Sequence, residues 1–210
     1  MTAKYEITKH SPSNTYNPRL FRIRALRNIP KFGVKKGDLG GFVEHEGNLS
    51  HEGDCWVGGG AHVSGNAQVS GNAYVFEYAR VIDNACITEN AQVYDHACIY
   101  NDARVYGNAC IYNDARVYGN AQVFDAARVF GNAKIFDNTT IWGHSNAFEN
   151  SQIYCSSSVN GYASVSGNAR ICNHAHIWVC IGVRRCLRDW QNSDIWACPS
   201  SRKRPSIWRG

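Results

Sequence analysis

A six-residue alternation of small, variable and aliphatic positions runs without insertion from Cys55 to Ile177. In each unit a small residue, usually Ala, is followed by a variable residue, an aliphatic residue, a second variable residue and two turn-forming residues, as in residues 67–72. The aliphatic position recurs 21 times and is Val or Ile every time except at Ala147. A fixed period of six is typical of a parallel β-helix, in which each unit supplies one short strand and one corner.

The side-chain chemistry of the unit indicates which face is buried. Alternate residues of an extended strand share a face, so the small and aliphatic residues point one way and the two variable residues the other. Variable positions hold Arg104, Arg116 and Lys134, which would be costly to bury, so the Ala and Val face is the interior. Gly, Asn and Asp fill the corners because they tolerate positive φ best. We predict an all-β fold of about seven triangular 18-residue coils, roughly 34 Å long at the spacing of β-strands.

The pattern divides the chain into three parts. Residues 1–50 break the repeat but contain alternating stretches at 5–8 and 20–26, so we predict a small N-terminal β cap over the open end of the first coil. Residues 51–178 form the repeat. From Cys180 the period stops, and residues 179–210 are rich in Arg, Ser, Cys and Trp. We expect an irregular basic tail there, either a genuine interaction tail or a translated out-of-frame end.

Charge and cysteine content narrow the location and the partners. The formal net charge is +5, but residues 51–178 carry six Lys and Arg against eleven Asp and Glu. A mildly acidic rod argues against nucleic acid along the coils, which requires a basic stripe. The sequence shows neither a secretory signal nor an apolar run long enough to span a bilayer, so we expect a cytoplasmic protein without membrane contact. Nine cysteines, an odd number, then favour free thiols.

Two stretches, residues 33–44 and 48–57, followed by Gly-Asn-Ala-x-Val repeats, resemble the YdcK-like hexapeptide-repeat proteins of enterobacteria and their prophages. The resemblance covers roughly residues 18–178. It implies a left-handed β-helix in the cytoplasm of a bacterial or phage-infected cell. Proteins of this group are commonly labelled acyltransferases or polymer-forming cytoskeletal proteins, and the repeats alone are similar to those of many hexapeptide acyltransferases.

The hexapeptide acyltransferases that the repeats resemble use a histidine as general base, beside an inserted loop at a cleft between trimer subunits. The unbroken period from 55 to 177 leaves no room for such a loop, and the eight histidines are scattered over corners and strand faces. We therefore expect no catalytic residue, no metal site and no cofactor. The weak catalytic candidate is His144, which lies between Trp142 and Phe148 and would serve a transferase that uses acetyl-CoA or another acyl-CoA.

The second variable position is aromatic in 13 of the 21 units. Rings that are 18 residues apart should stack on adjacent coils in three ladders. The ladders consist of Tyr100, Tyr118, Phe136 and Tyr154; of Phe76, Tyr94, Tyr112, Phe130 and Phe148; and of Tyr106, Phe124 and Trp142. Stacked cross-strand rings stabilise a sheet by up to ~1 kcal/mol per pair, whereas a large exposed apolar patch usually marks an interface.

Two functions follow from these patterns. The favoured one is a non-catalytic repeat scaffold that self-associates, as a homotrimer, or binds a protein or glycan partner through its aromatic ladders. The ladder from Phe76 to Phe148 is the longest and is therefore the preferred subunit contact. The alternative is a CoA-dependent acyltransferase of the hexapeptide-repeat type that works at a trimer cleft.

Overall fold

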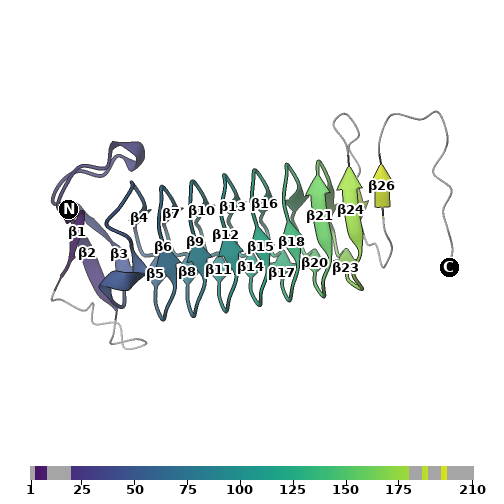
Figure 1. The fold of residues 1–210 in the computed structure, drawn as a ribbon, viewed down its shortest axis with the longest axis horizontal. Helices are drawn as coiled ribbons and strands as arrows, with labels where there is room; N and C mark the ends of the chain where they lie inside the picture. The colour runs from purple at the N-terminus through teal and green to yellow at the C-terminus, as the bar shows by residue number, and fades with distance from the viewer. Residues whose placement is uncertain (1–2, 9–19, 180–185, 189–194, 198–210) are drawn as a thin grey trace.

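The computed structural model describes residues 3–8, 20–179, 186–188 and 195–197. It is a straight rod in which coils stack along the long axis, with the N-terminal cap at one end (Figure 1). Every regular element in the described residues is a β-strand or a short 3-10 turn, namely η1 (Pro30–Phe32) and η2 (Glu46–Asn48). The all-β parallel solenoid predicted from the six-residue period is confirmed.

Three parallel sheets form the three faces of the rod. Face 1 contains β3 (Leu39–Val43), β5 (His62–Val63), β8 (Arg80–Val81), β11 (Cys98–Ile99), β14 (Arg116–Val117), β17 (Lys134–Ile135), β20 (Gln152–Ile153) and β23 (Arg170–Ile171). Face 2 contains β4 (Trp56–Val57), β7 (Tyr74–Val75), β10 (Gln92–Val93), β13 (Cys110–Ile111), β16 (Arg128–Val129), β19 (Asn146–Ala147), β22 (Ser164–Ser166) and β25 (Cys186–Arg188). Face 3 contains β6 (Gln68–Val69), β9 (Cys86–Ile87), β12 (Arg104–Val105), β15 (Gln122–Val123), β18 (Thr140–Ile141), β21 (Ser158–Gly161), β24 (His176–Val179) and β26 (Ile195–Ala197).

Along the repeat, strands of one face pair in register with residues 18 positions away, as Val93 pairs with Ile111 on face 2. Each face has eight parallel strands, so the rod has about eight turns, where the repeat alone predicts about seven coils. The additional strands are β3, which belongs to the cap, and β25 and β26, which lie within residues 179–210. Most of the rest of that segment, where we expect an irregular tail, lies outside the described residues.

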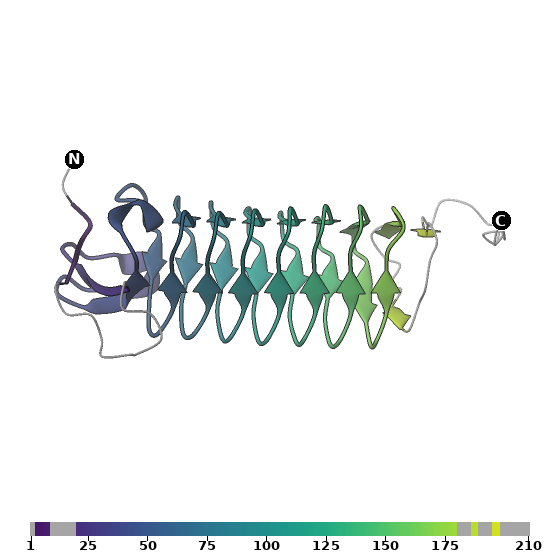
Figure 2. The ribbon, with the colours of Figure 1, turned by 90° about the horizontal axis from the view of Figure 1, so that it is seen from below.

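The cap extends face 1 beyond the first coil. Strands β1 (Tyr5–Ile7), β2 and β3 are antiparallel, with β2 spanning Phe21–Ala25, and β3 then pairs in parallel with β5. Side chains fasten β1 to the segment before the first coil, because the hydroxyl of Tyr5 donates to the backbone oxygens of Glu46 and Leu49 at 3.0 and 2.8 Å. Both strands predicted within residues 1–50 are present, and they cover one end of the rod (Figure 2).

Next to Tyr5, the fully buried Lys4 ties the cap to the repeat. Its Nζ donates to the Sγ of Cys55, the first residue of the repeat, at 3.0 Å and to the backbone oxygen of Glu52 at 3.3 Å. Burial lowers the pKa of Lys4 and raises the pKa of the Cys55 thiol, because each charged form would lose its hydration. Burial therefore disfavours the charged form of each group, the ammonium of Lys4 and the thiolate of Cys55.

The small and aliphatic positions of the repeat form one continuous core. All of them are at least 96% buried, which confirms the predicted inward face. One part of the core is polar, because four consecutive small positions are hydroxyl residues, namely Thr139, Ser145, Ser151 and Ser157. Of these four hydroxyls, only that of Ser145 has hydrogen-bond partners, the backbone oxygens of Trp142 at 2.7 Å and of Val159 at 3.4 Å.

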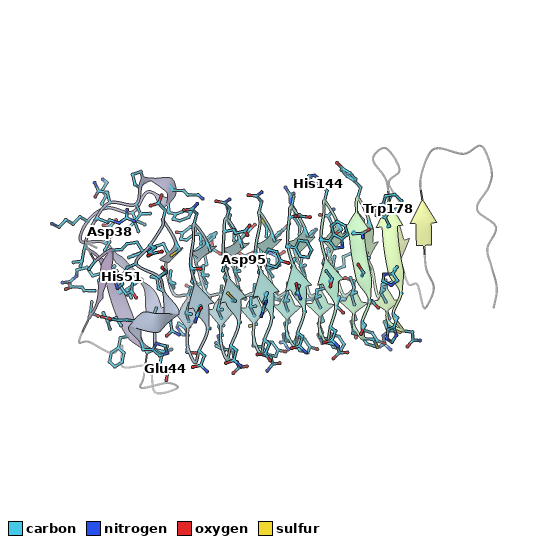
Figure 3. All side chains as sticks on the ribbon, viewed as in Figure 1. Asp38, Glu44, His51, Asp95, His144 and Trp178 are labelled. Carbon is cyan, nitrogen blue, oxygen red and sulfur yellow. The ribbon has the colours of Figure 1, made fainter. Side chains whose placement is uncertain are left out.

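Many acidic residues of the rod lie at its corners, where some of them bond to the backbone. Asp95 and Asp137 adopt left-handed backbone conformations, with φ near 58°. Their carboxylates accept hydrogen bonds from the backbone N–H one coil further on, Asp95 from Asn113 at 2.9 Å and Asp137 from Cys155 at 3.0 Å. These two corner carboxylates therefore bond to the neighbouring corner, and Asp95 is one of the side chains labelled in Figure 3.

Candidate functional site

All three predicted aromatic ladders form. On face 2 the ring centroids of Phe76, Tyr94, Tyr112, Phe130 and Phe148 follow one another at 4.8, 5.0, 4.9 and 5.0 Å. On face 1 the successive spacings of Tyr100, Tyr118, Phe136 and Tyr154 are 4.7, 4.9 and 4.9 Å. On face 3 the spacings of Tyr106, Phe124 and Trp142 are 4.8 and 5.9 Å. The structure thus brings together every ring that the 18-residue spacing assigns to a ladder.

The rings of each ladder cover one another's flat faces. Interplanar angles are 15° or less throughout the three ladders, and only 2° between Tyr94 and Tyr112. Burial between neighbours raises the pKa of Tyr94 to about 12. Trp142 is the most exposed of the ladder rings, with 37% of its surface accessible, and the others are partly buried. A ligand that approaches the middle of a ladder therefore meets ring edges and not π-faces.

The face 2 ladder continues into the cap, which the sequence reasoning missed. One coil before Phe76, Gly58 occupies the ring position, and the ring of Tyr74 fills the space beside this glycine, stacked on Phe76 at 4.3 Å. Phe32 of the cap then stacks on Tyr74 at 4.2 Å. The sequence does carry a signal for this extension. Gly58 leaves the ring position empty in one coil, and in the next coil the outward position before the aliphatic residue is an aromatic one, Tyr74. We call the seven-ring row Phe32, Tyr74, Phe76, Tyr94, Tyr112, Phe130 and Phe148 the long ladder.

Charges are distributed unevenly over the three faces. Of the six Lys and Arg in residues 51–178, one is on face 2, Arg128, and one on face 3, Arg104. The other four are on face 1, and they are Arg80, Arg116, Lys134 and Arg170. None of the six forms an ion pair with a described residue. The net charge of the rod does not reveal the four cations of face 1, because the carboxylates that outweigh them lie at the corners or beside the cap and not on the strands.

His144, the weak catalytic candidate, is an exposed corner residue at the edge of the rod (Figure 3). Its ring stacks on the ring of Tyr162 with centroids 4.9 Å apart, and its backbone N–H donates to the oxygen of Gly161 at 2.7 Å. No carboxylate among the described residues bonds its ring, so nothing there orients it as a base. His96 at another corner stacks on Tyr78 in the same way, at 5.3 Å.

Two surface depressions formed by described residues lie on faces 1 and 3. One of about 240 Å³ on face 1 is lined by Arg80, Ile82, Cys98, Tyr100 and Arg116. The other, of about 560 Å³, is on face 3 and includes Arg104 and Tyr106 in its lining. Within the described ranges no cluster of His, Cys, Asp or Glu could hold a metal ion.

Six cysteines of the described residues are free thiols, namely Cys55, Cys86, Cys98, Cys110, Cys155 and Cys172. The helical elements of the described segments are single three-residue turns, too short to cross a membrane.

The coils from β10 to β14 resemble a known family of repeats. Residues 91–107 and 103–119 match the YdcK Beta solenoid repeat. The match covers these two overlapping segments in the middle of the rod, where the face 2 ladder passes from Tyr94 to Tyr112. No curated protein matches the chain. The finding and the fold together support a YdcK-like repeat protein, as the resemblance in sequence predicts. The bacterial or prophage source and the left-handed coil stay predictions.

Proposed function

We propose that this protein is a non-catalytic repeat scaffold that self-associates as a homotrimer through the long ladder of face 2. The observation that carries the proposal is an uninterrupted row of seven stacked rings, from Phe32 to Phe148, on a face to which residues 51–178 contribute a single cation, Arg128. Such a scaffold requires no cofactor. We place it in the cytoplasm of a bacterial or phage-infected cell.

The distribution of charge favours face 2 over face 1 as the contact between copies. A contact of face 1 with itself would bring two rows of four cations together, and like charges across an interface cost several kcal/mol. The outward strand positions of face 2 are largely neutral, with Gln92, Cys110, Asn146 and Ser164 in the row that contains Arg128. Little charge then has to lose its hydration when a second copy covers the rings.

The ladder is also preorganised for binding. Each ring inside the row is already held between two stacked neighbours, as Tyr112 is between Tyr94 and Phe130 at about 5 Å. Because these side chains are ordered before association, covering their edges costs little further rotamer entropy. Tyrosine is also enriched among the residues that dominate interface energetics.

The test is a matched pair of triple variants measured by light scattering. Tyr94→Ser, Tyr112→Ser and Phe130→Ser together remove the middle of the long ladder and leave the core unchanged, so the trimer should dissociate to monomers. Tyr100→Ser, Tyr118→Ser and Phe136→Ser together remove as many stacked rings from face 1 and should leave the trimer intact. If both variants keep the mass of the wild-type particle, or both lose it equally, the long ladder is not the contact.

A further inference from the structure

Face 1 carries a straight row of cations along the rod, which we call the basic row: Arg80, Arg116, Lys134 and Arg170. These side chains occupy the same position of successive coils, with Cys98 between the first two and Gln152 between the last two. The strand spacing makes the successive intervals along the axis roughly 9.6, 4.8 and 9.6 Å. The row is therefore a rigid, linear array about 24 Å long.

The basic row is not neutralised by the protein. Within the described residues its four cations have neither ion pairs nor hydrogen bonds, and the outward strand positions of these coils on face 1 hold no carboxylate. Neutral side chains lie alongside, including Tyr100, whose ring helps line the 240 Å³ depression between Arg80 and Arg116. Four unpaired cations on one flat face indicate an anionic partner.

The edges of face 1 limit the width of that partner. The corner on one side carries Asp83, Asp102 and Asp137, and the corner on the other side carries Glu77, Asp95, Asp114 and Glu149. The positive strip is therefore bounded by negative charge on both sides. A double-stranded nucleic acid would place phosphates against these corners, whereas a single thin polymer that runs along the axis would not.

Two thin polymers fit the strip poorly. Single-stranded nucleic acid is bound by stacking its bases on aromatic faces, and the ring faces of the Tyr100 to Tyr154 ladder are covered by one another. An extended acidic peptide repeats its same-face side chains about every 6.6–6.8 Å. That interval matches neither one coil nor two coils of the rod.

We propose that the basic row binds a linear acidic polysaccharide with one carboxylate per disaccharide, lying parallel to the rod axis. An extended disaccharide is about as long as two coils, so two successive carboxylates match Arg80 and Arg116. The third carboxylate then lies at the coil of Gln152, between Lys134 and Arg170, where either long side chain can extend toward it. The guanidinium groups can hold carboxylates in bidentate geometry, and Gln152 and the tyrosine hydroxyls can bond to sugar hydroxyls. Because the site is on face 1, it does not depend on association through face 2.

The experiment uses the full-length protein and hyaluronan fragments, in which every second sugar carries a carboxylate. Binding is followed by titration calorimetry at low salt, with a matched pair of double variants. Arg80→Gln with Arg116→Gln should weaken binding at least about fivefold, because two surface ion pairs are lost. Arg104→Gln with Arg128→Gln removes the same charge from faces 2 and 3 and should change the affinity by less than about twofold.

Two comparisons can overturn the proposal. Equal weakening by the two double variants would show that hyaluronan responds to net charge alone. Tighter binding of poly-glutamate or of a single-stranded oligonucleotide than of hyaluronan would show that the partner is not a polysaccharide. Absence of hyaluronan binding by the wild-type protein would also refute it. The face 2 triple variant should still bind hyaluronan, which keeps this test separate from that of self-association.

Discussion

The buried hydroxyl of Ser151 offers a direct test of how the core of the solenoid is held together. Its Oγ is shielded from solvent and has no hydrogen-bond partner, whereas the equivalent residues one coil before and after, Ala133 and Ala169, have no polar group at that position. An unsatisfied buried hydroxyl costs about 1–3 kcal/mol. Because Ala already fits the neighbouring coils, Ser151→Ala should stabilise the protein by an amount in that range.

Ser145 is the matched control. It is equally buried and also lies between alanines, Ala127 and Ala163, but its hydroxyl donates to the backbone oxygen of Trp142 at 2.7 Å. Ser145→Ala should therefore destabilise the protein by about 0.5–1.5 kcal/mol, the usual net value of one hydrogen bond. The two substitutions remove the same atom and are expected to act in opposite directions.

The assay must resolve local stability, since stacked repeats interact mainly with their neighbours and can unfold in parts. Hydrogen exchange of the backbone amides of Phe136 and Tyr154, which donate to Ile153 and Ile171 across the affected coils, reports the free energy of local opening. Guanidinium unfolding gives the global value. If Ser151→Ala lowers protection as much as Ser145→Ala does, the Ser151 hydroxyl has a partner, and the interpretation of the polar core is wrong.

Three further predictions concern the core, the chemistry and the cap. Val117→Asp places a carboxylate between Ile99 and Ile135 in the core at a cost of several kcal/mol, and soluble expression of a folded rod would contradict the inward assignment. Acetyl transfer from acetyl-CoA to amino- or hydroxy-sugars should stay at background, and turnover that disappears in His144→Ala would instead support the acyltransferase. Burial, and secondarily the charge of Arg80, lower the pKa of His62 from 6.5. The folded protein therefore holds this histidine neutral, and its contribution to stability should be complete above pH 6.5 and be lost as the pH falls toward the lowered pKa. The acid slope of the unfolding free energy should therefore flatten in His62→Gln, and an unchanged slope would exclude this contribution.

Much of the fold could be predicted because a single period determines both the strand and the stacking partner. Once Val93 and Ile111 are 18 residues apart on the same side of a strand, their register and their burial follow, and so does the stacking of Tyr94 on Tyr112. The turns beyond the repeat could not be counted in this way. Strand β3 belongs to the antiparallel cap, whose pairing with β5 depends on tertiary contacts and not on a period.

The candidate surfaces were predictable to a smaller extent. The long ladder extends to Phe32 only because Gly58 leaves room for the ring of Tyr74, and this depends on side-chain orientation. The basic row was hidden by the net charge of the rod, since acidic corners outnumber the cations. The hydrogen bonds of Asp95 and Asp137 to neighbouring corners show that many of these carboxylates serve the backbone, which total charge cannot reveal.

The central claim is that the scaffold assembles through its long ladder, and the mass of the wild-type particle tests it most directly. Sedimentation equilibrium at micromolar concentration, repeated at high salt, measures this mass without a variant. We predict a trimer that persists at high salt, because the contact is apolar and salt does not screen it. A wild-type protein that is monomeric at micromolar concentration would contradict self-association through the rings from Phe32 to Phe148.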